Sequence, residues 1–109
     1  MSVYKPGKSP YYHYDFVWNG RRFHGFTKAL AQEGAKFNVT VNAIAPGYID
    51  TDMVAAVPGE VLEKIVAKIP VGRLGQASEI ARAVTFLCCD EGGFVTGSTL
   101  SINGGQHMY

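Results

Sequence analysis

The chain has 109 residues, of which 47% are hydrophobic and 17% are charged, and its formal net charge is +1. This composition predicts one small globular domain and excludes a disordered chain. A net charge this close to zero gives no overall preference for nucleic acid or for a membrane surface. The charges divide unevenly, because residues 1–25 hold four basic residues and one acidic residue, whereas residues 26–109 hold six basic and eight acidic residues.

The first residues predict an extended arm followed by a β-hairpin. Residues 1–10 contain two prolines and a glycine, which disfavour regular structure. Asn19-Gly20 lies between two aromatic-rich runs, and this dipeptide favours the tight type I′ turn of a hairpin. The hairpin would span residues 11–26. Alternation along its strands would place five aromatic side chains on one face: Tyr12, Tyr14, Phe16, Trp18 and Phe23.

From residue 26 onward the pattern is that of an α/β protein. The expected elements are a helix over 26–33 ended by Gly34, a buried strand over 38–45, a helix over 60–68, a turn at 72–75, a helix over 77–89 and a strand over 98–102. Two strands with helices between them indicate a parallel crossover. Two strands alone do not make a stable parallel sheet, so we expect further strands beside them.

The cysteines and histidines give no sign of a disulfide or a metal site. Cys88 and Cys89 are adjacent and are the only cysteines, so we expect two reduced thiols that pack as small hydrophobic groups. The three histidines lack the spacing of metal ligands. Neither a signal peptide nor an apolar run of membrane-spanning length is evident. We therefore expect a cytoplasmic protein without a membrane segment.

Six short segments together resemble the C-terminal part of the short-chain dehydrogenase/reductase family. They are FTKALA at 26–31, VTVNAIAPGYI at 39–49, TDM at 51–53, GRLG at 72–75, TG at 96–97 and INGG at 102–105. The segment at 46–49 and the ending of the chain look most like the NADPH-dependent acetoacetyl-CoA reductase group, followed by the 3-oxoacyl-acyl-carrier-protein reductases. The resemblance implies that residues 26–109 are the C-terminal fragment of a Rossmann-type, doubly wound parallel sheet.

The resemblance also implies a site at the carboxyl end of the strand at 38–45. Pro46, Gly47, Ile49 and Thr51 would contact NADP(H), with Ile49 offering backbone groups to the carboxamide and Thr51 its hydroxyl. Gly47 and Tyr48 would contact an acyl-thioester substrate, and the helix over 60–68 would belong to a mobile lid. From the residues alone, a plain turn at 46–47 and a surface role for Thr51 are the better explanation, and the resemblance reverses that preference.

The sequence departs from the family in the residues that carry catalysis. No glycine-rich nucleotide loop follows a predicted strand. The family's catalytic tyrosine and lysine are expected just before Phe26, where their positions fall on Phe16 and Gly20. Phenylalanine has no hydroxyl and glycine has no amine, so no catalytic residue is assigned. We expect this chain to be inactive alone and not to bind NADP(H) by itself.

Residues 2–25 resemble the N-terminal arm of phage-type tyrosine recombinases, which contacts DNA. The resemblance implies a segment of foreign origin over residues 1–25, with phosphate contacts from its basic residues Lys5, Lys8, Arg21 and Arg22. The alternative, which we favour, is an amphipathic hairpin that packs on the rest of the chain.

Two other functions remain open beside a reductase origin, namely a weak DNA-binding module and a non-enzymatic interaction or vestigial protein. In the second case the chain would associate with itself or with an intact reductase. The family uses its last strand and the preceding helix for subunit contacts, which makes Ile80, Val84, Leu100 and Ile102 the expected interface residues.

Overall fold

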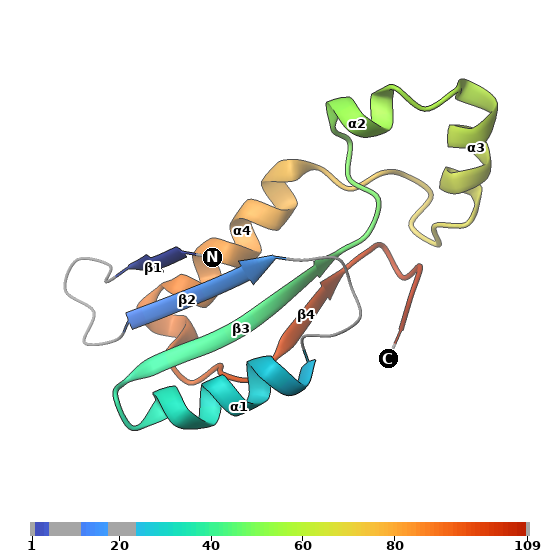
Figure 1. Cartoon of the computed structure of the whole chain (residues 1–109). Helices are drawn as coiled ribbons and strands as arrows, with labels where there is room; N and C mark the ends of the chain where they lie inside the picture. Colours follow the sequence, from blue (N-terminus) through green and yellow to red (C-terminus); the bar gives the residue numbers. More distant parts are fainter. Residues whose placement is uncertain (1, 5–11, 18–23, 109) are drawn as a thin grey trace. The chain divides into compact units, whose positions relative to one another are not determined.

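The computed structural model describes the backbone of residues 2–4, 12–17 and 24–108 and the side chains of residues 27–108. The strands are β1 (Ser2–Tyr4), β2 (Tyr12–Val17), β3 (Val39–Pro46) and β4 (Thr99–Ile102). The helices are α1 (His24–Ala35), α2 (Asp52–Ala55), α3 (Gly59–Ala67), α4 (Ala77–Cys88) and the short 3₁₀ turn η1 (Asp90–Gly92). Figure 1 shows these elements in chain order.

The four strands form one sheet in the order β1-β2-β3-β4. β2 runs parallel to β3, in a register that joins Tyr12 to Val39 at one end and Val17 to Ile44 at the other. β1 is antiparallel to β2. β4 runs parallel to β3, because the hydrogen bonds from Ala43 to Ser98 and from Gly47 to Ile102 advance in the same direction along both strands. The α/β class and the parallel crossover follow the sequence pattern.

The hairpin prediction for residues 11–26 is wrong. The strand over 12–17 pairs with β3 and β1, and residues 24–26 belong to α1 instead of a returning strand. The turn proposed at Asn19-Gly20 lies outside the described residues. The physical reason is that β3 is a β-branched strand that needs a neighbour on each side. An aromatic-rich strand can pair with β3 as well as with the second strand of a local hairpin. The turn preference of Asn-Gly does not decide between these two pairings.

This pairing supplies the further strand expected beside β3. β2 lies on one side of β3, and β4 lies on the other. The terminal strands of the described sheet are therefore β1 and β4.

The chain divides into two compact units, one of residues 1–45 with 82–100 and one of residues 46–81 with 101–109. The core of the first unit is built on β3, where residues 40–44 are all buried. Because successive strand residues point to opposite faces, this run indicates that both faces of the strand are covered. The side chains that complete this core are Thr27 and Ala31 from α1 and Leu87 and Cys88 from α4.

Polar side chains fasten the loop before β4 to β3. Asn42, only 2% exposed, donates a hydrogen bond from Nδ2 to the carbonyl of Val95 at 2.9 Å, and its Oδ1 accepts one from the Ser98 N–H at 3.1 Å. The Val41 N–H donates to Thr96 Oγ1 at 3.0 Å. Asn42 therefore connects β3 to a loop more than fifty residues away in sequence and satisfies two backbone groups.

The helices largely follow the predicted spans. α3 and α4 each lie within one residue of the expected ends, whereas α1 continues through Gly34 to Ala35, and α2 and η1 were not predicted. The chain leaves α1 through Asn38, whose φ of 58° is in the left-handed region that asparagine tolerates. The left-handed residue is therefore this asparagine, which lies in the turn between α1 and β3.

Both cysteines are free thiols, as expected. Cys88 is buried. Burial is the main cause that raises the pKa of its thiol, and the neighbouring Cys89 raises it further. Cys89 is half-buried, and its Sγ donates to the carbonyl of Phe86 at 2.9 Å. No helix in the described part of the chain is long and apolar enough to cross a membrane.

Candidate functional site

The segment that leaves the carboxyl end of β3 makes a close approach to the segment after β4. The Gly47 N–H donates to the carbonyl of Ile102 at 2.9 Å. A Cβ atom at position 47 would lie 2.7 Å from both Cα and Cβ of Asn103, a separation that side chains do not tolerate. Gly47 is therefore required by packing, beyond the turn that the Pro46-Gly47 sequence predicts.

Residues 48–50 form a short extended segment that is bonded on one edge only. The backbone carbonyl of Tyr48 accepts a hydrogen bond from the Gly75 N–H at 2.9 Å. The Asp50 N–H donates to the Gly75 carbonyl at 2.8 Å. Ile49 lies opposite Gly75 in this parallel bridge. In such a bridge the central residue's own N–H and C=O point to the other edge. Within the described residues, no hydrogen bond uses these two groups of Ile49.

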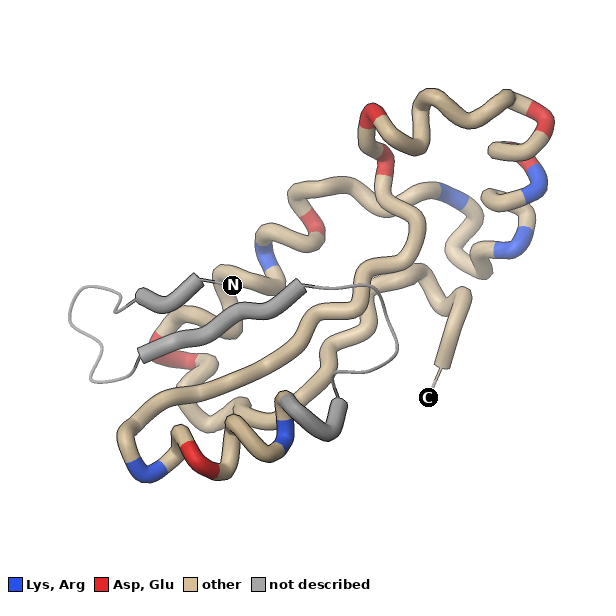
Figure 2. The backbone as a smooth tube through the Cα atoms, in the orientation of Figure 1, with Lys and Arg blue, Asp and Glu red and all other residues tan. Residues whose placement is uncertain are grey.

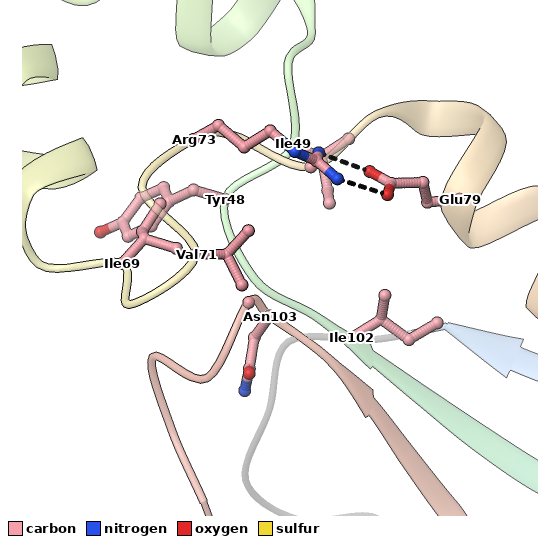
Figure 3. Close-up of a pocket in the computed structure, with 10 residues that line it drawn as sticks. Tyr48, Ile49, Ile69, Val71, Arg73, Glu79, Ile102 and Asn103 are labelled. Carbon is pink, nitrogen blue, oxygen red and sulfur yellow. Dashed lines mark hydrogen bonds and ion pairs between the residues drawn. The ribbon is translucent and has the colours of Figure 1, made fainter.

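A hollow of about 150 Å³ lies beside this segment. Figure 3 shows the side chains around it. They are mostly apolar, with a charged pair at one side and an amide at another: Tyr48, Ile49, Ile69, Val71, Arg73, Glu79, Ile102 and Asn103, with Gly75 and Gly104. Tyr48 is 41% exposed, so a ligand outside the protein can reach its ring.

Thr51 immediately precedes α2 and occupies its N-cap position. Its carbonyl accepts hydrogen bonds from the N–H groups of Val54 and Ala55, both at 2.9 Å. Its side chain is exposed and makes no capping bond to the helix. The hydroxyl is therefore available to a ligand, although it does not line the hollow.

The charged pair beside the hollow is Arg73 with Glu79. Arg73 Nη2 lies 2.8 Å from Glu79 Oε1 and Nη1 lies 2.9 Å from Oε2, a two-pronged geometry. The hydrogen bond and the charge of Glu79 raise the pKa of Arg73. Sequence reasoning treated residues 72–75 only as a turn and missed both side chains. A glutamate three residues after Gln76, at the start of a helix, is the signal that could have found Glu79.

Asn103 is the other polar group that sequence reasoning missed. Its Nδ2 donates to the carbonyl of His107 at 2.7 Å, and its Oδ1 accepts from the Gly105 N–H at 3.1 Å. Gly104 and Gly105 both have positive φ angles, which glycine adopts without strain. The Asn-Gly-Gly sequence thus makes a tight turn after β4 that is closed by its own asparagine.

The catalytic tyrosine and lysine of the resemblance have no counterpart here. Phe16, at the tyrosine position, lies in the strand β2 opposite Ala43. Away from these positions, tyrosine and lysine occur once with the family's spacing, at Tyr4 and Lys8. Tyr4 ends the strand β1, so this pair does not lie on the helix that brings residues four apart to one face.

Charges of both signs occur over α2, α3 and the turn that follows. Figure 2 shows acidic and basic positions along the same stretch of tube. Asp52 and Glu60 lie in the first turns of α2 and α3, and Lys64 lies in the last turn of α3. Neither sign dominates this part of the described chain, so apolar contacts and directed hydrogen bonds, rather than net charge, would select a ligand here.

Comparison with known proteins gives matches over most of the chain. A family model described as Enoyl-(Acyl carrier protein) reductase matches residues 22–107. The acetoacetyl-CoA reductase of Shinella zoogloeoides is 68% identical over 83 residues, which cover 75% of this chain and 34% of that protein. The acetoacetyl-CoA reductase of Rhizobium meliloti is 64% identical over 85 residues, which cover 77% of this chain and 35% of the relative.

A second group of relatives carries a related name. The 3-oxoacyl-(acyl-carrier-protein) reductase FabG of Pseudomonas aeruginosa is 52% identical over 84 residues, which cover 77% of this chain and 34% of that protein. The chain thus spans about a third of the length of the curated relatives it matches. The matches confirm the resemblance expected from the short motifs between residues 26 and 105, and this chain belongs to the short-chain dehydrogenase/reductase family.

Proposed function

We propose that this chain derives from an NADPH-dependent reductase of 3-oxoacyl thioesters, and that it carries the nicotinamide side of the cofactor site without being active alone. The observation that carries the proposal is the outward edge of Ile49. An N–H and a C=O on one residue that no hydrogen bond within the described residues uses match the hydrogen-bonding groups of a carboxamide, which has one acceptor and two donors. The names of the relatives supply the substrate class, acetoacetyl-CoA or another 3-oxoacyl thioester.

Each residue of the segment would have a separate task. Ile49 would hold the carboxamide through its backbone, and the Thr51 hydroxyl would add a hydrogen bond. Gly47 would allow the chain to turn beside the ring, and Tyr48 would contact the acyl thioester. Bound NADPH would supply the hydride for reduction of the 3-oxo group. This sequence has neither the family's proton donor nor its phosphate-binding loop at the corresponding positions. Other residues would have to supply both.

A chimeric enzyme tests whether this segment can perform its part. Residues 26–109 would replace the matching segment of the Shinella zoogloeoides acetoacetyl-CoA reductase, where 68% of residues are already identical. We expect NADPH-dependent reduction of acetoacetyl-CoA at a rate comparable with the parent. Gly47→Ala in the chimera should lower kcat/KM by about 10²-fold, because a Cβ 2.7 Å from Asn103 displaces the ring-binding segment by a fraction of an ångström or more.

Gly59→Ala is the matched control for this substitution. Gly59 begins α3, and a Cβ atom there would meet no other atom within 4 Å. The control should leave kcat/KM at the value of the unmodified chimera. A folded chimera without activity, or equal effects of the two glycine substitutions, would show that the 46–51 segment does not have the proposed role.

We further propose that the chain associates with a second copy through β4. This strand is the last in the order of the described sheet, and Leu100 on it is 37% exposed. An edge strand presents unpaired backbone groups that recruit another strand. Of the other interface residues expected from the family, Ile80, Val84 and Ile102 are half-buried.

Size-exclusion chromatography tests this association. We expect the purified chain to elute as a dimer or larger species, and Leu100→Lys to shift it toward the monomer because a lysine on the edge disfavours strand pairing. The control is Phe37→Lys, which removes an exposed apolar side chain outside β4, at 66% exposure. A monomeric chain with a sharp, cooperative melting transition would refute the association.

A further inference from the structure

The turn between α3 and α4 is closed by one carboxylate that accepts three hydrogen bonds. Glu79 receives two from the guanidinium of Arg73, as Figure 3 shows, and its Oε2 also accepts the backbone N–H of Gln76 at 2.7 Å. The Glu79 N–H returns a bond to the Gln76 carbonyl at 2.9 Å. The bond from the Gln76 N–H to the carboxylate is that of a helix capping box, whereas the return bond goes to a backbone carbonyl instead of a side-chain oxygen. It restrains the turn between Arg73 and α4 from both ends.

Arg73 adds a second restraint inside the turn. Its Nη1 donates to the carbonyl of Leu74 at 3.0 Å in addition to Glu79. A single exposed ion pair contributes little to stability, since water screens it and two long side chains lose freedom. The pair here differs because it is two-pronged and because both partners also bond the backbone of the same turn. Its effect should therefore be local order of the turn rather than global stability.

The residue held at the centre of this turn is Gly75, which makes both hydrogen bonds to the 48–50 segment. Gly75 also lies close to the Ile49 side chain, since a Cβ at position 75 would lie 2.7 Å from Cδ1 of Ile49 unless that side chain rotated away. The orientation of the Ile49 backbone is therefore set by Gly75. Gly75 in turn is held between Arg73 and the start of α4.

We propose that Glu79 is a positioning residue, which acts through Arg73 and Gly75 to aim the outward N–H and C=O of Ile49 at a ligand amide. The identity of that ligand as a nicotinamide rests on the proposed function, whereas the mechanical link rests on the contacts within residues 48–79. Glu79 itself does not touch the outward edge of Ile49. Loss of its carboxylate should loosen the segment without removing any group that a ligand would contact.

Amide hydrogen exchange of the full 109-residue chain, followed by NMR without ligand, tests this link. In Glu79→Gln, the amides of Asp50 and Gly75 should exchange about tenfold faster or more. The turn can then open locally without the free-energy cost of breaking the Arg73–Glu79 ion pair. The reference amides are Ala43 and Gly97, which bond across β3 and the loop before β4. These should keep their exchange rates, since the turn does not contact them through any described hydrogen bond.

Two further variants distinguish the effect of losing the Arg73–Glu79 pair from the effect of losing any surface charge. Arg73→Gln should accelerate the same two amides to a similar extent, and the double variant should add nothing, as expected for two residues that act as one unit. Glu63→Gln removes an exposed carboxylate from α3 and should leave every rate unchanged. If Glu79→Gln proves too unstable to study, Arg73→Lys keeps the charge and should give a smaller acceleration at the same amides.

Equal acceleration of the Asp50, Gly75, Ala43 and Gly97 amides would overturn the proposal, because it would indicate a role in global stability alone. Unchanged exchange at Asp50 and Gly75 would overturn it as well. Neither result depends on a bound cofactor, so failure of this link is distinguishable from failure of the proposed function. An inactive chimera would count against the function and would leave the exchange result standing.

Discussion

The purified chain is expected to oxidise no measurable NADPH in the presence of acetoacetyl-CoA. In the family, a tyrosine donates the proton to the carbonyl oxygen while a nearby lysine makes that donation easier. The corresponding positions here are Phe16, which lies in β2, and Gly20. Loss of a general acid alone lowers a rate by about 10²–10⁴-fold, and no glycine-rich phosphate loop is present in the sequence to bind the cofactor.

The measurement is the decrease of NADPH absorbance with chain purified from a host whose own acetoacetyl-CoA reductase is deleted. The parent Shinella zoogloeoides reductase, treated in the same way, gives the positive control. A second arm uses the chain with Tyr4→Phe, because Tyr4 and Lys8 have the spacing of the family's pair. Robust turnover that Tyr4→Phe abolishes would contradict our interpretation and would place the proton donor on β1.

Asn42→Ala is expected to lower the free energy of unfolding by about 2–4 kcal/mol, because it removes two part-buried hydrogen bonds from a buried amide to backbone groups. Those groups are the carbonyl of Val95 and the N–H of Ser98. Asn42 is 2% exposed, so water cannot easily replace its amide. The loss should also weaken the attachment of the 95–98 loop to β3, which lowers the stability of the first unit as a whole.

Urea denaturation followed by circular dichroism measures this loss. Asn103→Ala is the matched control, since that asparagine also makes two hydrogen bonds to backbone groups but does so at an exposed turn. Asn103→Ala should lower the free energy of unfolding by about 1 kcal/mol, because water can bond the backbone groups that the substitution leaves behind. Equal losses from the two substitutions would indicate that burial of Asn42 is not what makes it important.

Local patterns predicted the elements from residue 26 onward well. α3 and α4 were identified from apolar spacing, and β3 from its β-branched run and the Pro46-Gly47 that follows. These signals arise within a few residues of each other, so they are visible before any tertiary contact forms. The end of α1 was misplaced because Gly34 is tolerated within the helix and the left-handed residue that follows it is Asn38.

The N-terminal strand was misassigned for a different reason. Asn19-Gly20 favours a hairpin, but the strand over 12–17 pairs with β3, more than twenty residues away. Turn propensity contributes a small local preference. The hydrogen bonds and apolar burial offered by a strand such as β3 are nonlocal and outweigh it. Sequence periodicity does not predict which other strand a given strand pairs with.

The sequence by itself determined the family and the α/β class and predicted a site at the 46–51 segment, because these depend on motif order and on backbone preferences of proline and glycine. Only the tertiary structure decided which backbone groups of that segment bond to Gly75 and which point to the other edge. The bridge to Gly75 turns the backbone of Ile49 outward, and the Arg73–Glu79 pair that restrains Gly75 joins residues whose geometry no spacing rule specifies. A residue's hydrogen-bonding edge depends on its partner across the fold, and that partner is set by packing.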